Sequence, residues 1–242
     1  MIQTLRFLFA IFLLTVWHGG IVMVAALFGT KHREGGVYDK AQRRWGGGVL
    51  RWTGIRVRVI GGEKLDAAAS AVYISNHASF LDICALLQVL PGTVRFVFKK
   101  EMNRIPVLGH AMRAMRHISI DRKNLSAAFA AYEEAAGMIR GGISAVVFAE
   151  GTRSHDGKLH TFKKGPFVLA IAAGVPVIPV FCEDTFAALP KGSVCPKPGT
   201  VTLRIGDPIP TAGSSYEDRT PLSQTARAQL VAMGAEPVDT PA

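Results

Sequence analysis

Residues 73–82 read YISNHASFLD, and the expected fold follows from this stretch. The apolar run at 71–75 predicts a buried strand, and the apolar residues from 79 to about 90 predict a helix. Ser79 and Asp82 have the three-residue spacing of a capping box, which marks a helix start. The stretch therefore predicts a strand, a turn that contains His77, and a helix with Asp82 in its first turn.

His77 and Asp82 are five residues apart, a spacing that matters for their contact. In one continuous helix they would lie about 140° apart, too far to touch easily. Because His77 precedes the helix, the chain can fold back so that Asp82 reaches its ring. A carboxylate on one ring nitrogen fixes the tautomer and leaves the other nitrogen to accept a proton. Such a pair suits an enzyme that activates a hydroxyl on its substrate.

A purely structural interpretation fits the same residues. Asp82 would then be a helix cap and His77 an ordinary loop histidine. The stretch alone leaves both interpretations open.

A second polar turn follows the apolar strand expected at 143–148 and reads FAEGTRS from residue 148 to residue 154. Gly151 allows close backbone approach to a ligand, and Thr152 offers a hydroxyl. Arg153 carries a planar guanidinium that suits a phosphate group. The turn is therefore a candidate anion site.

Together, Asn76-His77 with Asp82 and the Glu150-Gly151-Thr152-Arg153 turn resemble the glycerolipid acyltransferases, specifically the 1-acylglycerol-3-phosphate acyltransferase family. Residues 99–109 and 118–122 are similar to two further stretches of this family. The chain departs from the family pattern at Arg116, where glycine is usual, at Ser119, where a larger residue is usual, and at Ala149, where proline is usual. The resemblance covers residues 55–205.

The resemblance implies acyl transfer from a thioester to the hydroxyl of 1-acylglycerol-3-phosphate (lysophosphatidic acid), which makes phosphatidic acid. His77 would be the general base, and Asp82 would orient its ring. The thioester would be acyl-CoA or an acylated acyl carrier protein, with no cofactor. Backbone N–H groups near the turn would stabilise the oxyanion. No metal is expected, because the other histidines lack HExxH spacing.

The resemblance also implies an acceptor pocket. Arg122 and Arg153 would grip the acceptor's phosphate, and Gly151 and Thr152 would line the pocket. Glu150 would either anchor the loop or meet the acceptor's glycerol.

Other functions remain open at this stage. A lyso-ornithine lipid acyltransferase, or another lysophospholipid acyltransferase, would keep the chemistry and change the acceptor. A thioesterase would need water in the basic acceptor pocket, which argues against it. A membrane-anchored lipid-binding module would not need an oriented base.

The chain of 242 residues combines a net charge of +10 with 49% hydrophobic residues. This combination favours an anionic membrane surface over nucleic acid, for which no binding motif is present. The three cysteines lack CxxC spacing and predict reduced thiols in a cytoplasmic domain.

Residues 5–28 are almost entirely apolar and long enough to cross a bilayer. A cleaved signal peptide is the alternative. The basic residues that follow favour a cytoplasmic location for the catalytic part: Lys31, Arg33, Lys40, Arg43, Arg44, Arg51, Arg56 and Arg58. Full crossing and a re-entrant segment are equally compatible with the sequence.

The expected organisation is a membrane segment at 1–30, a basic interfacial segment at 31–54, an acyltransferase domain at 55–210, and a C-terminal helix with a loose tail at 211–242. A plain domain-entry helix is the alternative for 38–53. Strands are expected at 55–60, 71–75, 94–98, 118–122, 143–148, 175–180 and 201–205, and further helices at 125–140, 167–173 and 221–233. This alternation predicts an α/β fold with a central, mostly parallel or mixed sheet covered by helices.

Overall fold

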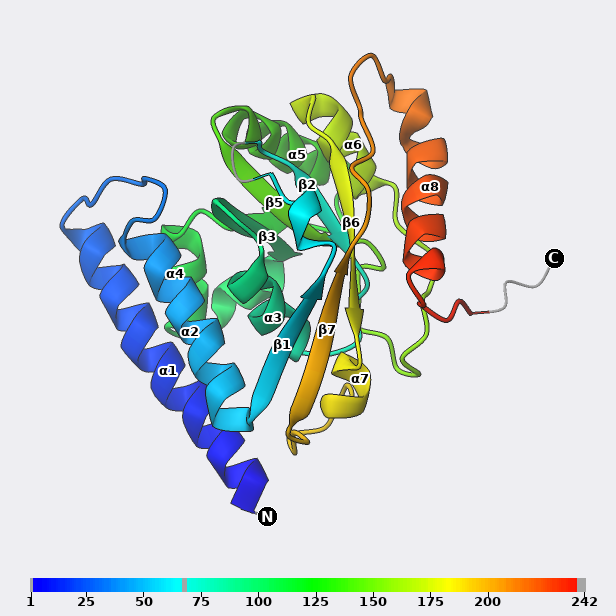
Figure 1. Ribbon diagram of the computed structural model, residues 1–242. Coiled ribbons are helices and arrows are strands. Elements are labelled where there is room, and N and C mark those ends of the chain that lie inside the picture. Colours follow the sequence, from blue (N-terminus) through cyan, green and yellow to red (C-terminus); the bar gives the residue numbers. More distant parts are fainter. Residues whose placement is uncertain (1, 67–68, 239–242) are drawn as a thin grey trace.

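The computed structural model describes residues 2–66 and 69–238, which form a seven-stranded sheet with helices on both faces (Figure 1). The strands are β1 (Ile55–Ile60), β2 (Val72–Ser75), β3 (Thr93–Lys99), β4 (Ile118–Ile120), β5 (Ile143–Phe148), β6 (Val177–Glu183) and β7 (Gly199–Ile205). The α-helices are α1 (Ile2–Leu27), α2 (Val37–Thr53), α3 (Leu81–Val89), α4 (Leu108–Ala114), α5 (Leu125–Arg140), α6 (Gly165–Ala173), α7 (Thr185–Ala188) and α8 (Arg219–Ala232). Short 3₁₀ turns are η1 (Gly62–Lys64), η2 (Lys100–Arg104) and η3 (Tyr216–Asp218).

The strand order is β1-β7-β6-β2-β5-β3-β4. Every neighbouring pair is parallel except β6 and β7, so the sheet is mixed and mostly parallel, and the predicted fold class is confirmed. The carboxyl ends of β2, β5 and β3 meet at one edge because these strands are parallel neighbours. In open α/β sheets this edge is where ligands bind.

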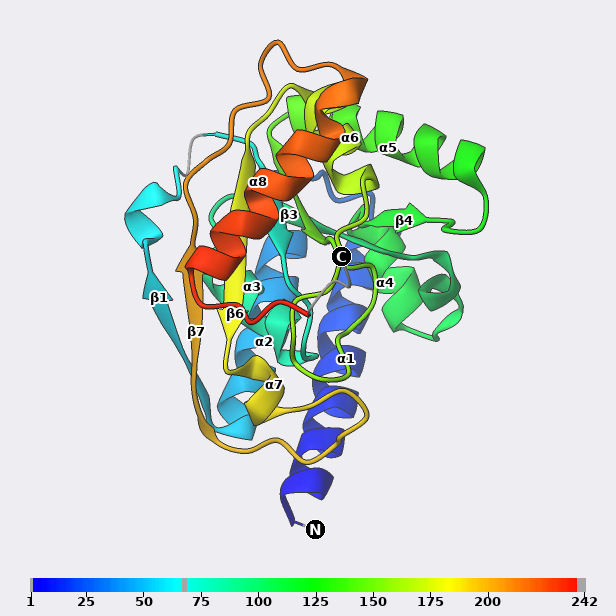
Figure 2. The same ribbon diagram turned by 90° about the vertical axis from the view of Figure 1, so that its right-hand side faces the viewer.

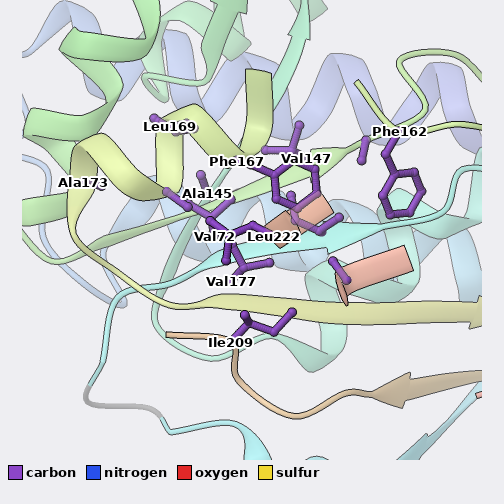
Figure 3. Close-up of a cluster of buried hydrophobic side chains, with 14 of the residues drawn as sticks. Val72, Ala145, Val147, Phe162, Phe167, Leu169, Ala173, Val177, Ile209 and Leu222 are labelled. Atoms are coloured by element: carbon purple, nitrogen blue, oxygen red, sulfur yellow. The ribbon is translucent and has the colours of Figure 1, made fainter. Parts of the chain in front are cut away.

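The two faces of the sheet pack against different helices, because side chains alternate along each strand. Val72 and Ile74 of β2 pack with α5, α6 and α8, in the cluster that Figure 3 shows. Tyr73 between them packs with α2 and α3 on the other face. Figure 2 shows α8 in front of the sheet and α2 and α3 behind it. Burial on both faces explains why these strands are continuous apolar runs.

The helix α1 packs along its length against α2 and α4. Phe7, Ala10, Gly19 and Val22 face inward, whereas most of its large apolar side chains are exposed. The helix is long and apolar enough to cross a membrane, by length and composition alone.

The segment 38–53 is a helix of the folded body. Tyr38, Ala41, Val49 and Leu50 of α2 are buried. Gly46 brings α2 close to α3, since a Cβ there would lie 3.3 Å from the carbonyl oxygen of Cys84. Its packing is that of a domain-entry helix, the second of the two interpretations of this segment.

Some element limits differ from those expected. The helix expected from residue 79 begins at Leu81, and the sequence patterns missed α4 altogether. The expectation of a loose tail is wrong for residues 234–238, because Leu159 N donates to Glu236 O at 2.7 Å and Ala235 is buried. Residues 239–242 of that tail lie outside the described residues.

Candidate active site

His77 and Asp82 form a hydrogen-bonded pair in the turn after β2. Nδ1 of His77 lies 2.9 Å from Oδ2 of Asp82, which is fully buried. The same oxygen accepts the backbone N–H groups of Ala78 at 2.9 Å and Ser79 at 2.8 Å. The second of these contacts is half of the predicted capping box, whereas Ser79 Oγ donates to Leu189 O and accepts the backbone N–H of Leu81 at 3.1 Å. With Nδ1 donating to the carboxylate, Nε2 is left to accept a proton.

The ring of His77 has a fixed orientation as well as a fixed tautomer. It stacks on Phe148 with ring centroids 3.7 Å apart and planes 12° apart. The side chain is 14% exposed, so a substrate can still reach it.

Glu150 connects the turn after β5 to the turn after β2. Its Oε1 accepts the backbone N–H of His77 at 2.8 Å, and its Oε2 accepts that of His160 at 3.0 Å. The carboxyl is buried, and burial raises its pKa against the opposing effect of these hydrogen bonds. Ser154 N donates to His77 O at 2.7 Å, so both backbone polar groups of His77 are held by this one segment.

Two cations hold the backbone of the Gly151–Arg153 turn. Gly151 has φ of 78°, a left-handed conformation that favours glycine. Its carbonyl oxygen accepts a hydrogen bond from the guanidinium of Arg122. Lys191 Nζ donates to Arg153 O at 2.8 Å. The guanidinium of Arg153 has no hydrogen bond or ion pair within the described residues.

A cavity of about 380 Å³ opens at this site. His77, Arg122 and residues 151–153 line its polar part at the ends of the strands. Side chains of α1, α2 and α4 line the remainder, which is largely apolar and includes Val22, Trp45, Leu108 and Met112. The arrangement joins a base, a free cation and an apolar chamber.

The structure brings six of the seven predicted site residues to this cavity: His77, Arg122, Gly151, Thr152, Arg153 and, through its bond to His77, Asp82. Glu150 does not line it, and both of its carboxylate oxygens are occupied by backbone N–H groups. Two roles were open for Glu150, to anchor the loop or to meet the acceptor's glycerol. Its position is that of a loop anchor.

Backbone N–H groups near the turn after β2 were expected to stabilise the oxyanion, but those of the turn itself already have acceptors. The N–H groups of His77, Ala78 and Ser79 already bind Glu150 or Asp82. They are therefore not free to bind an oxyanion.

Sequence reasoning missed three residues of the site: Lys99, which lines the cavity, Phe148, which stacks on His77, and Lys191. Lys99 lies in the family-like stretch 99–109, to which the sequence assigns no ligand. Lys191 carries no local signal, because it lies in the irregular segment before β7.

Comparisons with known proteins agree with this geometry. Residues 56–183 match the family model described as Acyltransferase. The chain is 37% identical over 208 residues to a 1-acyl-sn-glycerol-3-phosphate acyltransferase of Limnanthes douglasii, covering 84% of this chain and 72% of the relative. It is 32% identical over 179 residues to the alpha form of that enzyme from Homo sapiens, covering 74% of this chain and 63% of the relative.

A solved structure gives the same result for the whole fold. The crystal structure of the 1-acyl-sn-glycerophosphate (LPA) acyltransferase PlsC from Thermotoga maritima superposes with a TM-score of 0.79 at 29% identity. The match covers 98% of this chain and 97% of the other. The resemblance inferred from the two motifs is thereby confirmed, and the chain belongs to the acyltransferase family and is itself an acyltransferase.

Proposed function

We propose that this enzyme transfers a fatty acyl group from acyl-CoA or an acylated acyl carrier protein to the free hydroxyl of 1-acylglycerol-3-phosphate. The product is phosphatidic acid. The observation that carries this proposal is that the His77–Asp82 pair opens onto the same cavity as the Arg153 guanidinium and an apolar chamber. The names of the relatives support the same acceptor.

The reaction proceeds by direct attack. Nε2 of His77 takes the proton from the acceptor hydroxyl while its oxygen attacks the thioester carbonyl. Asp82 stabilises the imidazolium that forms. When the tetrahedral intermediate collapses, the carbon–sulfur bond breaks, and the imidazolium returns its proton to the departing thiolate. An ester and a free thiol result.

A cysteine acyl-enzyme is not needed and is disfavoured by the site. Cys182 is buried with its Sγ 3.3 Å from Ser75 Oγ, and burial raises its pKa well above the usual value. Burial likewise raises the pKa of Cys84. Both thiols are poor nucleophiles because the thiolate is the reactive form.

The acceptor phosphate binds at Arg153. Its guanidinium is unoccupied and lines the polar part of the cavity. Arg122 and Lys191 fix the carbonyl groups on either side, which limits how far the turn can move. A bidentate guanidinium–phosphate contact is stronger than a neutral hydrogen bond.

The enzyme attaches to a membrane through α1. Its outward face carries exposed Phe9, Phe12, Trp17 and Leu27, which water solvates poorly. The basic segment after α1 supports a cytoplasmic position for the catalytic part.

The test is acyl transfer by membranes that contain the protein. Labelled acyl-CoA and acylated carrier protein are each offered with 1-acylglycerol-3-phosphate or lyso-ornithine lipid. We expect labelled phosphatidic acid from wild type, none from His77→Ala, and normal amounts from His110→Ala, an exposed histidine of α4. Product from lyso-ornithine lipid alone would keep the base and remove the phosphate role of Arg153. Lipid binding without product would mean that the protein is a membrane-anchored lipid-binding module.

A further inference from the structure

The apolar chamber contains polar atoms that the proposed reaction does not use. Gln42 of α2 is 4% exposed and lines the cavity. Its Oε1 is buried and has no hydrogen-bond partner within the described residues. A buried carbonyl without a partner costs about 1–3 kcal/mol, so it marks a position where a ligand atom belongs.

The orientation of Gln42 is fixed by the strand beside it. Its Nε2 donates to Val94 O at 3.1 Å. Only the amide nitrogen can donate, so the oxygen is necessarily the free atom of the pair. Gln42 Oε1 is therefore a hydrogen-bond acceptor in the cavity wall.

His117 supplies a matching donor. Its Nδ1 accepts the backbone N–H of Phe96 at 2.9 Å, so the ring proton is on Nε2. Burial and nearby Arg95 lower its pKa to about 3, and the ring is neutral at physiological pH. His117 lines the same cavity, and its Nε2–H has no acceptor in the part of the chain that the structure describes.

Both side chains occupy one edge of β3. The neighbouring β4 pairs only with Val97, Phe98 and Lys99, so β3 extends beyond it. Gln42 and His117 take the backbone groups of Val94 and Phe96 on the part that β4 leaves uncovered. These anchors are two residues apart, or about 7 Å. Gln42 and His117 are thus anchored at neighbouring positions on the same edge of β3.

The register of the sheet gives the distance of the two anchor residues, Val94 and Phe96, from the reactive end of the cavity. Val94 and Phe96 pair with Ser144 and Val146 of β5. Phe148, on which His77 stacks, is the last residue of that strand. The two anchors therefore lie about 13 Å and about 7 Å along the sheet from the reactive end. A ligand group there is in the middle of a long chain and not beside its thioester.

We propose that Gln42 and His117 form a subsite for a hydroxyl in the middle of the acyl chain. The hydroxyl donates to Gln42 Oε1 and accepts from His117 Nε2–H, which satisfies both polar atoms at once. The preferred donor is then a mid-chain hydroxyacyl thioester. His18 of α1, whose buried Nδ1 also has no partner within the described residues, borders the same cavity. This inference rests on the proposed function, since it assigns the acyl chain to the chamber.

The first test compares two donors of equal length, stearoyl-CoA and a stearoyl-CoA that carries a hydroxyl at the middle of its chain. We expect wild-type kcat/KM to be about 10-fold higher for the hydroxylated donor. Gln42→Met, of similar length, should remove the preference, so that the two donors give equal kcat/KM. Gln224→Met, at an exposed position of α8, should keep the wild-type ratio. Equal rates for both donors in wild type, as a water bound between the two side chains would give, would overturn the proposal.

The role of His117 as the hydrogen-bond donor is tested with a variant that preserves the fold. His117→Asn keeps an acceptor for the N–H of Phe96 and removes Nε2–H. The variant should lower the ratio of kcat/KM for the hydroxylated donor to kcat/KM for stearoyl-CoA several-fold. An unchanged ratio would exclude His117 from the subsite.

A binding measurement separates this inference from the proposed reaction. Trp45 lines the cavity, and the chain has three tryptophans. In a Trp17→Phe, Trp52→Phe background, fluorescence of Trp45 reports binding of stearate or mid-chain hydroxystearate without turnover. We expect about 10-fold tighter binding of the hydroxylated acid, lost with Gln42→Met. Absence of acyl transfer from every donor would refute the function, whereas equal binding of the two acids would refute the subsite.

Discussion

Glu150 Oε1 accepts the backbone N–H of His77 at 2.8 Å, although the two residues are 73 positions apart in the chain. The candidate base is therefore positioned by the same turn that carries Arg153, the residue we propose for the acceptor phosphate. Movement of one turn must move the other. The candidate base and the proposed phosphate site are thus joined through Glu150, as a reaction between a bound hydroxyl and a fixed base requires.

Glu150→Gln tests this coupling. A glutamine keeps one acceptor but turns an amide N–H toward a backbone N–H, so one of the two bonds is lost. We expect kcat to fall about 10-fold and the free energy of unfolding to fall by about 1.5–3 kcal/mol. Steady-state kinetics and urea unfolding measure the two effects. Glu134→Gln, an exposed position on α5, is the control, and equal behaviour of both variants would contradict the anchor role.

Asp82→Asn should lower kcat far more than it changes acceptor KM. The amide cannot accept all three donors that Oδ2 now accepts, and it no longer stabilises an imidazolium. We expect a loss of about 10²–10⁴ in kcat. Wild-type turnover in this variant would remove the pair from the mechanism.

Arg153→Ala should act mainly on the acceptor. Loss of a charge-assisted contact to phosphate predicts a rise of about 10- to 100-fold in acceptor KM, with a smaller change in donor KM. Arg56→Ala on the edge strand β1 should leave both constants unchanged. If donor KM rises instead, Arg153 binds the thioester component.

Lys191→Met should weaken acceptor binding indirectly, through the backbone of Arg153. Lys191 Nζ donates to Arg153 O, and the same peptide group donates through Ser154 N to His77 O. Because methionine keeps the length and removes the donor, we expect kcat/KM to fall about 3- to 10-fold. A salt titration provides the check, since a residue that binds phosphate directly would change the salt dependence of acceptor binding and a backbone support would not.

The acid side of the stability profile should depend on His117. Its pKa falls from 6.5 to about 3 on folding, so between these values the unfolded chain binds a proton that the folded chain does not. Stability from this group is complete above about pH 6.5 and decreases as pH falls toward 3, by about 1.4 kcal/mol per pH unit. His117→Asn should flatten this part of the profile, measured by urea unfolding at several pH values. A slope identical to wild type would contradict the assignment.

The sequence by itself determined the seven strands, most of the helices and the pair of motifs. Strand β2, the helix after it and the Glu150–Arg153 turn follow from local apolar periodicity and turn chemistry, which depend on neighbours in the chain. The His77–Asp82 contact was also predictable, because five residues and a helix start confine both side chains. The roles of the site residues stay predictions.

Only the tertiary structure decided which distant residues complete the site. Lys191 reaches Arg153, Phe148 supports His77, and Gln42 and His117 each bind a backbone group at the uncovered edge of β3. The stacking of Phe148 on His77 depends on the pairing of β5 with β2, and the positions of Gln42 and His117 depend on how far β4 extends along β3. Local sequence patterns do not encode strand order, because it is set by the packing of whole faces against one another.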